Sequence, residues 1–407
     1  MNNIIPQDEI SSVAGSALTS YRKLLYVTPF HDSKLHSGAA IRSHNLCREL
    51  ARQFQVTVLA ATETHNDVEI SESCDANVIR SPFFKPVKRN KSMMLRILGK
   101  SAPGFSAIDV DLLKCEIDKI WEKEGSFDVL YFVTQMTASV LLIANYTGRI
   151  IIDMYDYYLP IALRKCESVP KHKLYHWVYR IEANKTAVME NNVLRCADDI
   201  LIPTEEEADK LRLSIKNIPI HVIENGTIIP ECHWQDQGSS NVLFVGNFTY
   251  GPNMEGLQWV LEKVWPSIRH ALPDSCLRIV GKGCEYVKIP RDSGVIAVGP
   301  VDDLSREYIS ASCCIIPILN GGGSRLKLLE AMAYGIPIVS TTLGASGIRH
   351  EGSIITADSS EDFSNGIIAC LGKENNVLAH CQRAAEIILR LYTWDKIGGK
   401  LRRILQT

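Results

Sequence analysis

The chain has 407 residues, of which 46% are hydrophobic and 22% are charged, and its formal net charge is −2. This balance is typical of a globular protein, argues against a disordered chain, and gives no indication that nucleic acid is a partner. Because a single hydrophobic core rarely grows beyond about 250–300 residues, the length predicts two domains.

The ends of the chain and its cysteines bear on the compartment. The first 20 residues carry Asp8 and Glu9 and lack a basic start before an apolar run, which is not typical of a signal peptide. No apolar stretch approaches the ~20 residues that a membrane-spanning helix needs. The 12 cysteines include no C-x-x-C pair, so a zinc or haem site has little support. We therefore expect free thiols in a reducing cytoplasm.

Strands and helices are predicted to alternate along the first half. Residues 24–28 (LLYVT) form a strand-like run, residues 39–54 repeat apolar side chains at helical spacing, and residues 56–61 (VTVLAA) form the next strand. Residues 129–133 and 150–152 continue the series. This alternation predicts βαβ units around a parallel sheet. Strands that are apolar at every position indicate that helices cover both faces.

The same pattern recurs after about residue 200. Buried strands are predicted at residues 242–245, 277–280, 295–298, 314–318 and 336–339. The polar run 231–240 (ECHWQDQGSS) is typical of a linker between domains. We therefore predict an α/β protein with two doubly wound domains.

We assign residues 1–200 to the first domain and 201–385 to the second. Residues 386–407 are predicted to be a closing helical segment. The sequence leaves open whether this segment completes the second domain or crosses back to the first.

Residues 83–105 depart from the rest of the chain because six Lys and Arg residues are mixed with Phe, Met, Leu and Ile. Such a mixture can lie on an anionic membrane surface. A solvated loop followed by an ordinary amphipathic helix is the alternative.

The most informative segment is residues 320–341 (NGGGSRLKLLEAMAYGIPIVST), which follows a predicted strand. Gly321, Gly322 and Gly323 leave backbone N–H groups accessible, and a helix begins near Ser324. A glycine loop that leads into a helix N-terminus is a natural site for an anion, because the free N–H groups and the helix dipole point toward it.

Three charged residues follow in the same helix. Arg325 and Lys327 place cations in the first turn, where the helix dipole disfavours them unless an anion is bound. Glu330 could accept hydrogen bonds from two hydroxyl groups, such as those of a ribose. A plain strand–loop–helix connection with a solvated Arg and Lys is the alternative.

These residues carry a family resemblance. The run GGGSRLKLLEAMA resembles the C-terminal signature of family-4 glycosyltransferases, which have the GT-B fold. Other segments agree with that family in order and spacing, namely residues 241–253 (NVLFVGNFTYGPN), 222–226 (VIENG), 392–395 (YTWD) and, more weakly, 28–30 (TPF) with 37–50 (SGAAIRSHNLCREL).

The resemblance implies two Rossmann-like domains that face each other across a cleft, the first binding the acceptor and the second the nucleotide sugar. It also implies transfer of the sugar to a hydroxyl of a glycan, lipid-linked or small-molecule acceptor, with retention of anomeric configuration. No metal and no cofactor other than the nucleotide-sugar co-substrate are implied. The expected location is cytoplasmic, at the inner face of the membrane if residues 83–105 contact lipid.

The sequence departs from the family at two places. Many members have two Glu residues separated by seven positions, whereas Gly322 stands at the first position here and Glu330 remains at the second. Many members also carry an Arg and a Lys after the first strand of the second domain, where Asn247 and Asn253 stand here. The usual phosphate clamp is therefore missing from its usual place, and we expect cations of the glycine loop to replace it.

In the first domain, Gly38 follows the first strand, and the resemblance implies that it lets the backbone approach the donor diphosphate or the acceptor. Asp156 follows the strand at residues 150–152, and ligands of open α/β sheets bind at the carboxyl ends of strands. We expect Asp156 to face the acceptor, with capping of the next helix as the alternative.

Three further polar residues have simpler interpretations. Arg42 either helps to bind a phosphate or lies on a helix surface. Glu182 and Glu190 are interpreted as salt-bridged surface residues of a long helix.

The predicted site is therefore as follows. The catalytic residues are Asp156, Arg325, Lys327 and Glu330. The donor-binding residues are Gly38, Asn247, Gly321, Gly322, Gly323, Ser324, Arg325, Lys327, Leu328 and Glu330.

Two other functions compete with glycosyl transfer. A nicotinamide-dependent oxidoreductase would need a G-x-G-x-x-G loop, but Gly281 and Gly283 are followed by Tyr286 at the third position. A nucleotide-sugar epimerase or a non-catalytic nucleotide-sugar-binding relative stays open, because the first Glu of the family pattern is absent.

Overall fold

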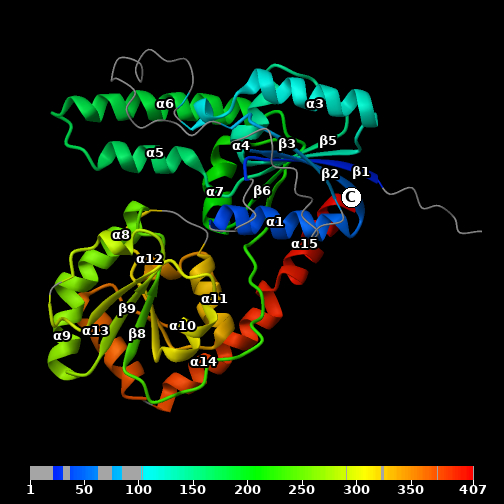
Figure 1. Ribbon diagram of the computed structural model, residues 1–407. Helices are drawn as coiled ribbons and strands as arrows, with labels where there is room; N and C mark the ends of the chain where they lie inside the picture. Colours follow the sequence, from blue (N-terminus) through cyan, green and yellow to red (C-terminus); the bar gives the residue numbers. More distant parts are fainter. Residues whose placement is uncertain are drawn as a thin grey trace, which may run out of the picture.

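The computed structural model describes residues 22–30, 37–62, 76–84, 102, 104–289, 291–321, 325–373 and 375–406. Within them lie two separate parallel sheets, each flanked by helices (Figure 1). This confirms the predicted α/β class with two doubly wound sheets.

The first sheet has the strand order β3-β2-β1-β4-β5-β6-β7. Its strands are β1 (Arg22–Thr28), β2 (Phe54–Ala61), β3 (Asn77–Ser81), β4 (Val129–Val133), β5 (Arg149–Asp153), β6 (Asp199–Ile202) and β7 (Ile220–Val222). Its helices are α1 (Gly38–Ala51), α3 (Val110–Glu124), α4 (Thr134–Thr137), α5 (Tyr158–Glu167), α6 (Leu174–Leu194) and α7 (Glu205–Ser214). Strand β4 is buried along its whole length and β1 is buried from Leu24 to Thr28, as the predicted strand-like runs suggest.

The second sheet has the order β10-β9-β8-β11-β12-β13. Its strands are β8 (Asn241–Val245), β9 (Cys276–Val280), β10 (Val295–Gly299), β11 (Cys313–Ile316), β12 (Ile338–Ser340) and β13 (Ile355–Thr356). Its helices are α8 (Gly251–Trp259), α9 (Trp265–Ala271), α10 (Ser305–Ser310), α11 (Leu326–Tyr334), α12 (Thr342–Ala345), α13 (Ser360–Leu371) and α14 (Asn375–Ile387).

The boundary that we predicted at residue 200 falls inside β6. Strand β6 pairs with β5 on one side and with β7 on the other, so the first sheet continues to Val222. The chain changes sheets between Val222 and Asn241, a stretch that includes the polar run 231–240.

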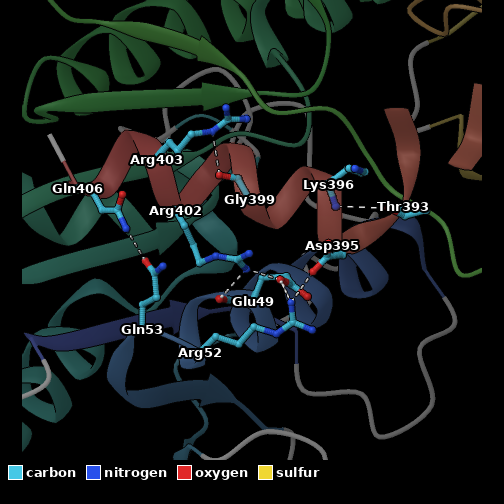
Figure 2. A network of polar contacts seen from close by, with 10 residues as sticks. All are labelled: Glu49, Arg52, Gln53, Thr393, Asp395, Lys396, Gly399, Arg402, Arg403 and Gln406. Atoms are coloured by element: carbon cyan, nitrogen blue, oxygen red, sulfur yellow. Dashed lines mark hydrogen bonds and ion pairs between the residues drawn. The ribbon is translucent and has the colours of Figure 1, made fainter. Parts of the chain in front are cut away.

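The last helix, α15 (Trp394–Gln406), returns to the first domain and packs against α1 (Figure 1). Figure 2 shows the polar contacts between these two helices: Arg402 bonds to Glu49, and Arg52 bridges Glu49 at 2.8 Å and Asp395 at 2.7 Å. Gly398 lies so close to Glu49 that a Cβ atom would overlap the Glu49 side chain. The segment that the sequence left unplaced therefore ties the second domain to the first.

Candidate active site

Both sheets have a point at which the strand order reverses, between β1 and β4 in the first and between β8 and β11 in the second. Ligands of open α/β sheets bind outside the carboxyl ends of the strands at such points. The loops that leave these strands carry most of the residues predicted from the sequence.

The loop after β11 has an unusual backbone. Gly321 has a φ of 93°, and a Cβ atom there would lie 2.7 Å from Cγ of Pro252, so glycine is required. Arg325 has φ 52° and ψ 18°, a left-handed conformation that is rare outside glycine and that clusters at functional sites. Gly322, Gly323 and Ser324 lie outside the described residues, so their predicted role in donor binding stays a prediction.

Lys327 and Glu330 lie one turn apart on α11. Burial lowers the pKa of the Lys327 ammonium to about 8, although Glu330 and Cys314 oppose this shift. Burial raises the pKa of Glu330, while a hydrogen bond of 3.3 Å from the Tyr308 hydroxyl and the Lys327 charge oppose that shift. In the part of the chain that the structure describes, Lys327 forms no ion pair. A desolvated cation of this kind gains from an incoming anion.

Arg325 faces the junction between the domains. Its Nη2 donates to Oγ of Ser346 at 3.2 Å. Burial lowers the pKa of its guanidinium, against the opposing effects of Tyr250, Glu207 and Asp156. Two of those groups, Glu207 and Asp156, belong to the first domain, so Arg325 is in electrostatic reach of both halves.

Asp156 is an acidic residue of the first domain that interacts electrostatically with Arg325. Burial, followed by the negative charge of Glu207, raises the pKa of its carboxyl to about 7, while Arg325 and Arg164 oppose the shift. Asp156 does not cap α5, since Glu190 takes that role. The two backbone N–H groups of Tyr158 and Leu159 donate to the Glu190 carboxylate at 3.0 and 3.1 Å.

Gln135 and Glu190 were missed as part of this region. Gln135 donates through Nε2 to the Asp156 carbonyl at 3.1 Å and to Oε1 of Glu190 at 2.7 Å. Glu190 is 2% exposed, and burial raises the pKa of its carboxyl to about 7. Glu182 is also buried, so the interpretation of both as surface residues is wrong. Gln135 and Glu190 are 55 residues apart, so no local sequence pattern indicates that they contact each other.

Two predicted donor-binding residues, Leu328 and Asn247, and the neighbouring Asn253 make structural contacts within the protein. Leu328 is fully buried in the core and its N–H donates to the Arg325 carbonyl at 3.0 Å, so its side chain is a core side chain. Asn247 is exposed in the loop after β8, where its Oδ1 accepts bonds from Thr249. Asn253 is buried and donates to the Asn247 carbonyl at 2.8 Å, which shapes this loop.

The start of α1 carries Gly38, which is predicted to bind the donor. Gly38 is the first residue of α1, and the Ser37 hydroxyl caps the helix by accepting from the Ala40 N–H at 3.2 Å. Arg42 is neither a phosphate ligand nor a surface residue, because it is 2% exposed and fully engaged by Asp153 and the chain at residues 223–225.

A cavity of about 300 Å³ lies between α5 and α6. Its wall is mostly apolar and includes Phe105, Met136 and Ile161. Tyr158 also lines it, and the Tyr158 hydroxyl is 2.7 Å from that of Tyr155. The cavity therefore adjoins the segment that carries Asp156.

Among the described residues, no group of three or more His, Cys, Asp or Glu side chains could hold a metal ion. Within the same ranges, no helix is long and apolar enough to cross a bilayer.

Comparisons with known proteins agree with this architecture. A family profile described as "Glycosyl transferase 4-like domain" matches residues 37–226, and one described as "Glycosyl transferases group 1" matches residues 239–373. The structure resembles a sucrose-phosphate synthase from Thermosynechococcus elongatus with a TM-score of 0.70 and 17% identity, over 95% of this chain and 98% of that one. It also resembles HepE of Anabaena, solved with UDP-glucose, with a TM-score of 0.63 and 14% identity, over 95% and 100% of the two chains.

The fold is therefore the GT-B fold of two-domain glycosyltransferases. The two profile matches support a protein like the group 1 and family-4 members of that class. Among curated proteins, an uncharacterized 44.6 kDa protein in the cps region of Klebsiella pneumoniae is 30% identical over 188 residues, which cover 42% of this chain and 46% of that protein. The chain spans about half the length of the curated relatives it matches.

Proposed function

We propose that the protein transfers a sugar from a nucleotide-sugar donor to the hydroxyl of an acceptor, with retention of anomeric configuration. The observation that carries this proposal is the pair of desolvated cations, Arg325 and Lys327, at the start of α11 and at the switch point of the second sheet. The profile matches and the likeness to a protein solved with UDP-glucose support it.

In this proposal, Arg325 and Lys327 hold the donor diphosphate, and Glu330 accepts the ribose hydroxyls. Fixed positive charge stabilises the nucleotide diphosphate as negative charge develops on it during departure. The acceptor hydroxyl attacks on the face that the nucleotide leaves, so no enzyme nucleophile is needed. Asp156, on the opposing domain, orients the acceptor hydroxyl. The bound nucleotide supplies the leaving group, and we propose no metal.

The acceptor is a glycan, a lipid-linked sugar or a small molecule, and it binds on the first domain. All the cysteines within the described ranges are free thiols, which supports a reducing, cytoplasmic compartment. The predicted membrane segment 83–105 lies largely outside the described residues; its described ends, at Phe83 and Phe105, are buried.

The test begins with a thermal-shift screen against UDP, GDP, dTDP and ADP. A ligand at 100 times its dissociation constant stabilises the fold by about 2.7 kcal/mol, which such a screen detects. The stabilising nucleotide then selects the labelled sugar donors for a transfer assay with and without acceptor, and NMR of the product gives its anomeric configuration. Binding without transfer to any acceptor would favour a non-catalytic relative, and a converted donor sugar would favour an epimerase.

A further inference from the structure

The outer face of α6 carries large apolar side chains. Leu174, Trp177 and Val188 are 62%, 58% and 62% exposed, and Ile181 is partly exposed beside them. Positions 174, 177, 181 and 188 lie on one side of an α-helix because side chains three, four and seven residues apart share a face. The opposite side of α6, including Ala183 and Thr186, is buried against the first domain. The outer face is thus an apolar stripe directed away from the core.

The charges beside this stripe have one sign. Between residues 171 and 195, the basic residues are Lys171, Lys173, Arg180, Lys185 and Arg195, and none of them is buried. The acidic residues of the same stretch, Glu182 and Glu190, are 6% and 2% exposed and point into the fold. The surface that α6 presents is therefore apolar in the middle and positive around it.

The position of α6 makes this face accessible. Figure 1 shows α5 and α6 as a pair of helices that projects beyond the first sheet, with α6 on the side of α5 away from the second domain. Gly104 and Phe105, at the described end of the basic segment 83–105, line the cavity between the same two helices. The described residues Gly104 and Phe105 therefore lie beside α6.

We propose that the outer face of α6 seats the protein on an anionic membrane surface. Trp and Leu side chains bury apolar area at the boundary between head groups and acyl chains, and the surrounding Lys and Arg residues attract anionic lipid. A second copy of the chain is a poorer occupant, because a two-fold contact through this face would bring like charges together. This inference does not depend on glycosyl transfer.

The experiment measures binding of the full chain to phosphatidylcholine vesicles with and without phosphatidylglycerol, by sedimentation at low and high salt. We expect binding that requires phosphatidylglycerol and weakens with salt, because exposed charges are screened. Lys171→Ser with Lys173→Ser should weaken it roughly thirtyfold, since each basic residue near the surface contributes about 1 kcal/mol. Leu174→Ser with Trp177→Ser should weaken it by a similar factor.

Matched controls distinguish binding through this face from nonspecific binding by other exposed apolar side chains. Leu213 and Tyr286 are 75% and 81% exposed on other elements, so Leu213→Ser with Tyr286→Ser should leave binding unchanged. All six tryptophans lie within the described residues, and Trp177 is the exposed one among them. Brominated lipids should therefore quench wild-type fluorescence, and Trp177→Phe should remove that quenching while binding persists.

Quenching of the wild-type protein needs no variant, so it holds even if a double variant folds poorly. Wild-type binding without quenching would overturn the proposal. The same conclusion would follow if the Leu174 and Trp177 variant binds normally, or if replacement of Lys88, Arg89 and Lys91 by Ser alone abolishes binding. A wild-type dimer that the Leu174 and Trp177 variant converts to monomer would assign the face to self-association instead.

Discussion

Arg42 on α1 and Asp153 at the end of β5 form an ion pair of 2.7 Å in which the two side chains are 2% and 1% exposed. The same guanidinium donates to the Ile223 carbonyl at 2.7 Å and to the Asn225 side chain at 3.1 Å. Asp153 also contributes to raising the pKa of the Tyr26 and Tyr131 hydroxyls, after burial. The buried Arg42 side chain therefore links α1, β5 and the chain at residues 223–225.

Removing either partner of this pair should destabilise the fold strongly. Arg42→Ala leaves the Asp153 carboxylate buried without its cation, and breaking a buried pair in this way typically costs about 3–5 kcal/mol. Urea denaturation of the full chain measures the loss. Arg390→Ala, which breaks the exposed pair with Glu351, is the matched control and should cost little because solvent screens that pair. Equal stability of the two variants would contradict the structural role given to Arg42.

Two adjacent glycines of α15 should respond in opposite ways to alanine. A Cβ atom at Gly398 overlaps the Glu49 side chain on α1, whereas a Cβ atom at Gly399 has Arg402 Nη2 as its nearest neighbour at 3.8 Å. Gly398→Ala should therefore destabilise the protein by about 1–3 kcal/mol through overpacking. Gly399→Ala should stabilise it by up to about 1 kcal/mol, because alanine favours the helix. Thermal denaturation compares them, and a stable Gly398→Ala would show that α15 does not pack tightly on α1.

Local patterns predicted four strands of the first sheet (β1, β2, β4 and β5) and five of the second (β8 to β12), because each of these strands is a short apolar run. The boundary at residue 200 was misplaced because β6 and β7 were not among the predicted strands, and only the pairing of β6 with β5 and of β7 with β6 shows which sheet they complete. Arg325 and Lys327 could be proposed together as site residues from the sequence, because they are close neighbours along the chain.

Buried polar residues could not be assigned in this way. Arg42 meets Asp153 across 111 residues, and Gln135 meets Glu190 across 55. A charged residue on a helix is usually solvated, so nothing local distinguishes these from surface residues. Thr134 shows the same limit: its φ of 77° at the end of β4 is rare for a β-branched residue and has no sequence signature.

The donor site makes the next prediction. Arg325→Ala and Lys327→Ala should each weaken binding of the stabilising nucleotide diphosphate by ten- to a hundredfold, since losing a charge-assisted contact costs roughly 1.5–3 kcal/mol. The kcat should fall as well, because the contacts strengthen as the leaving group gains charge. Calorimetry and transfer kinetics provide the two measurements. Glu330→Gln, which keeps an acceptor oxygen, should be milder than Glu330→Ala.

Unchanged nucleotide binding by Arg325→Ala would place the diphosphate clamp elsewhere. The melting temperature without nucleotide serves as the control for folding. It should change little in all of these variants, because the residues serve the ligand rather than the core.

Nucleotide affinity should also depend on pH through Lys327. The pKa of its ammonium is about 8 in the free protein, and a bound diphosphate would raise it. Affinity should therefore be constant below pH 8 and fall above it, by up to about tenfold per pH unit, until the pKa of the complex is reached. Titration calorimetry between about pH 7 and pH 10 checks this slope. Lys327→Arg keeps its charge throughout this range, so a slope that persists in that variant would assign the titration to another group.

Asp156 should set the acidic limb of the pH–rate profile. If its carboxylate orients the acceptor hydroxyl, kcat/KM should rise with pH through about 7, the pKa of this group. Asp156→Asn should lower the rate and remove the limb. Glu207→Gln should move the limb to lower pH, because the negative charge of Glu207 raises the pKa of Asp156 and its loss favours the charged carboxylate. A structural role for Glu207 would lower activity at every pH without moving the limb. Initial rates of sugar transfer, measured across pH at low acceptor concentration, distinguish these two roles of Glu207. If the limb keeps its position in Glu207→Gln and is also present in Asp156→Asn, the titration belongs to a group other than Asp156.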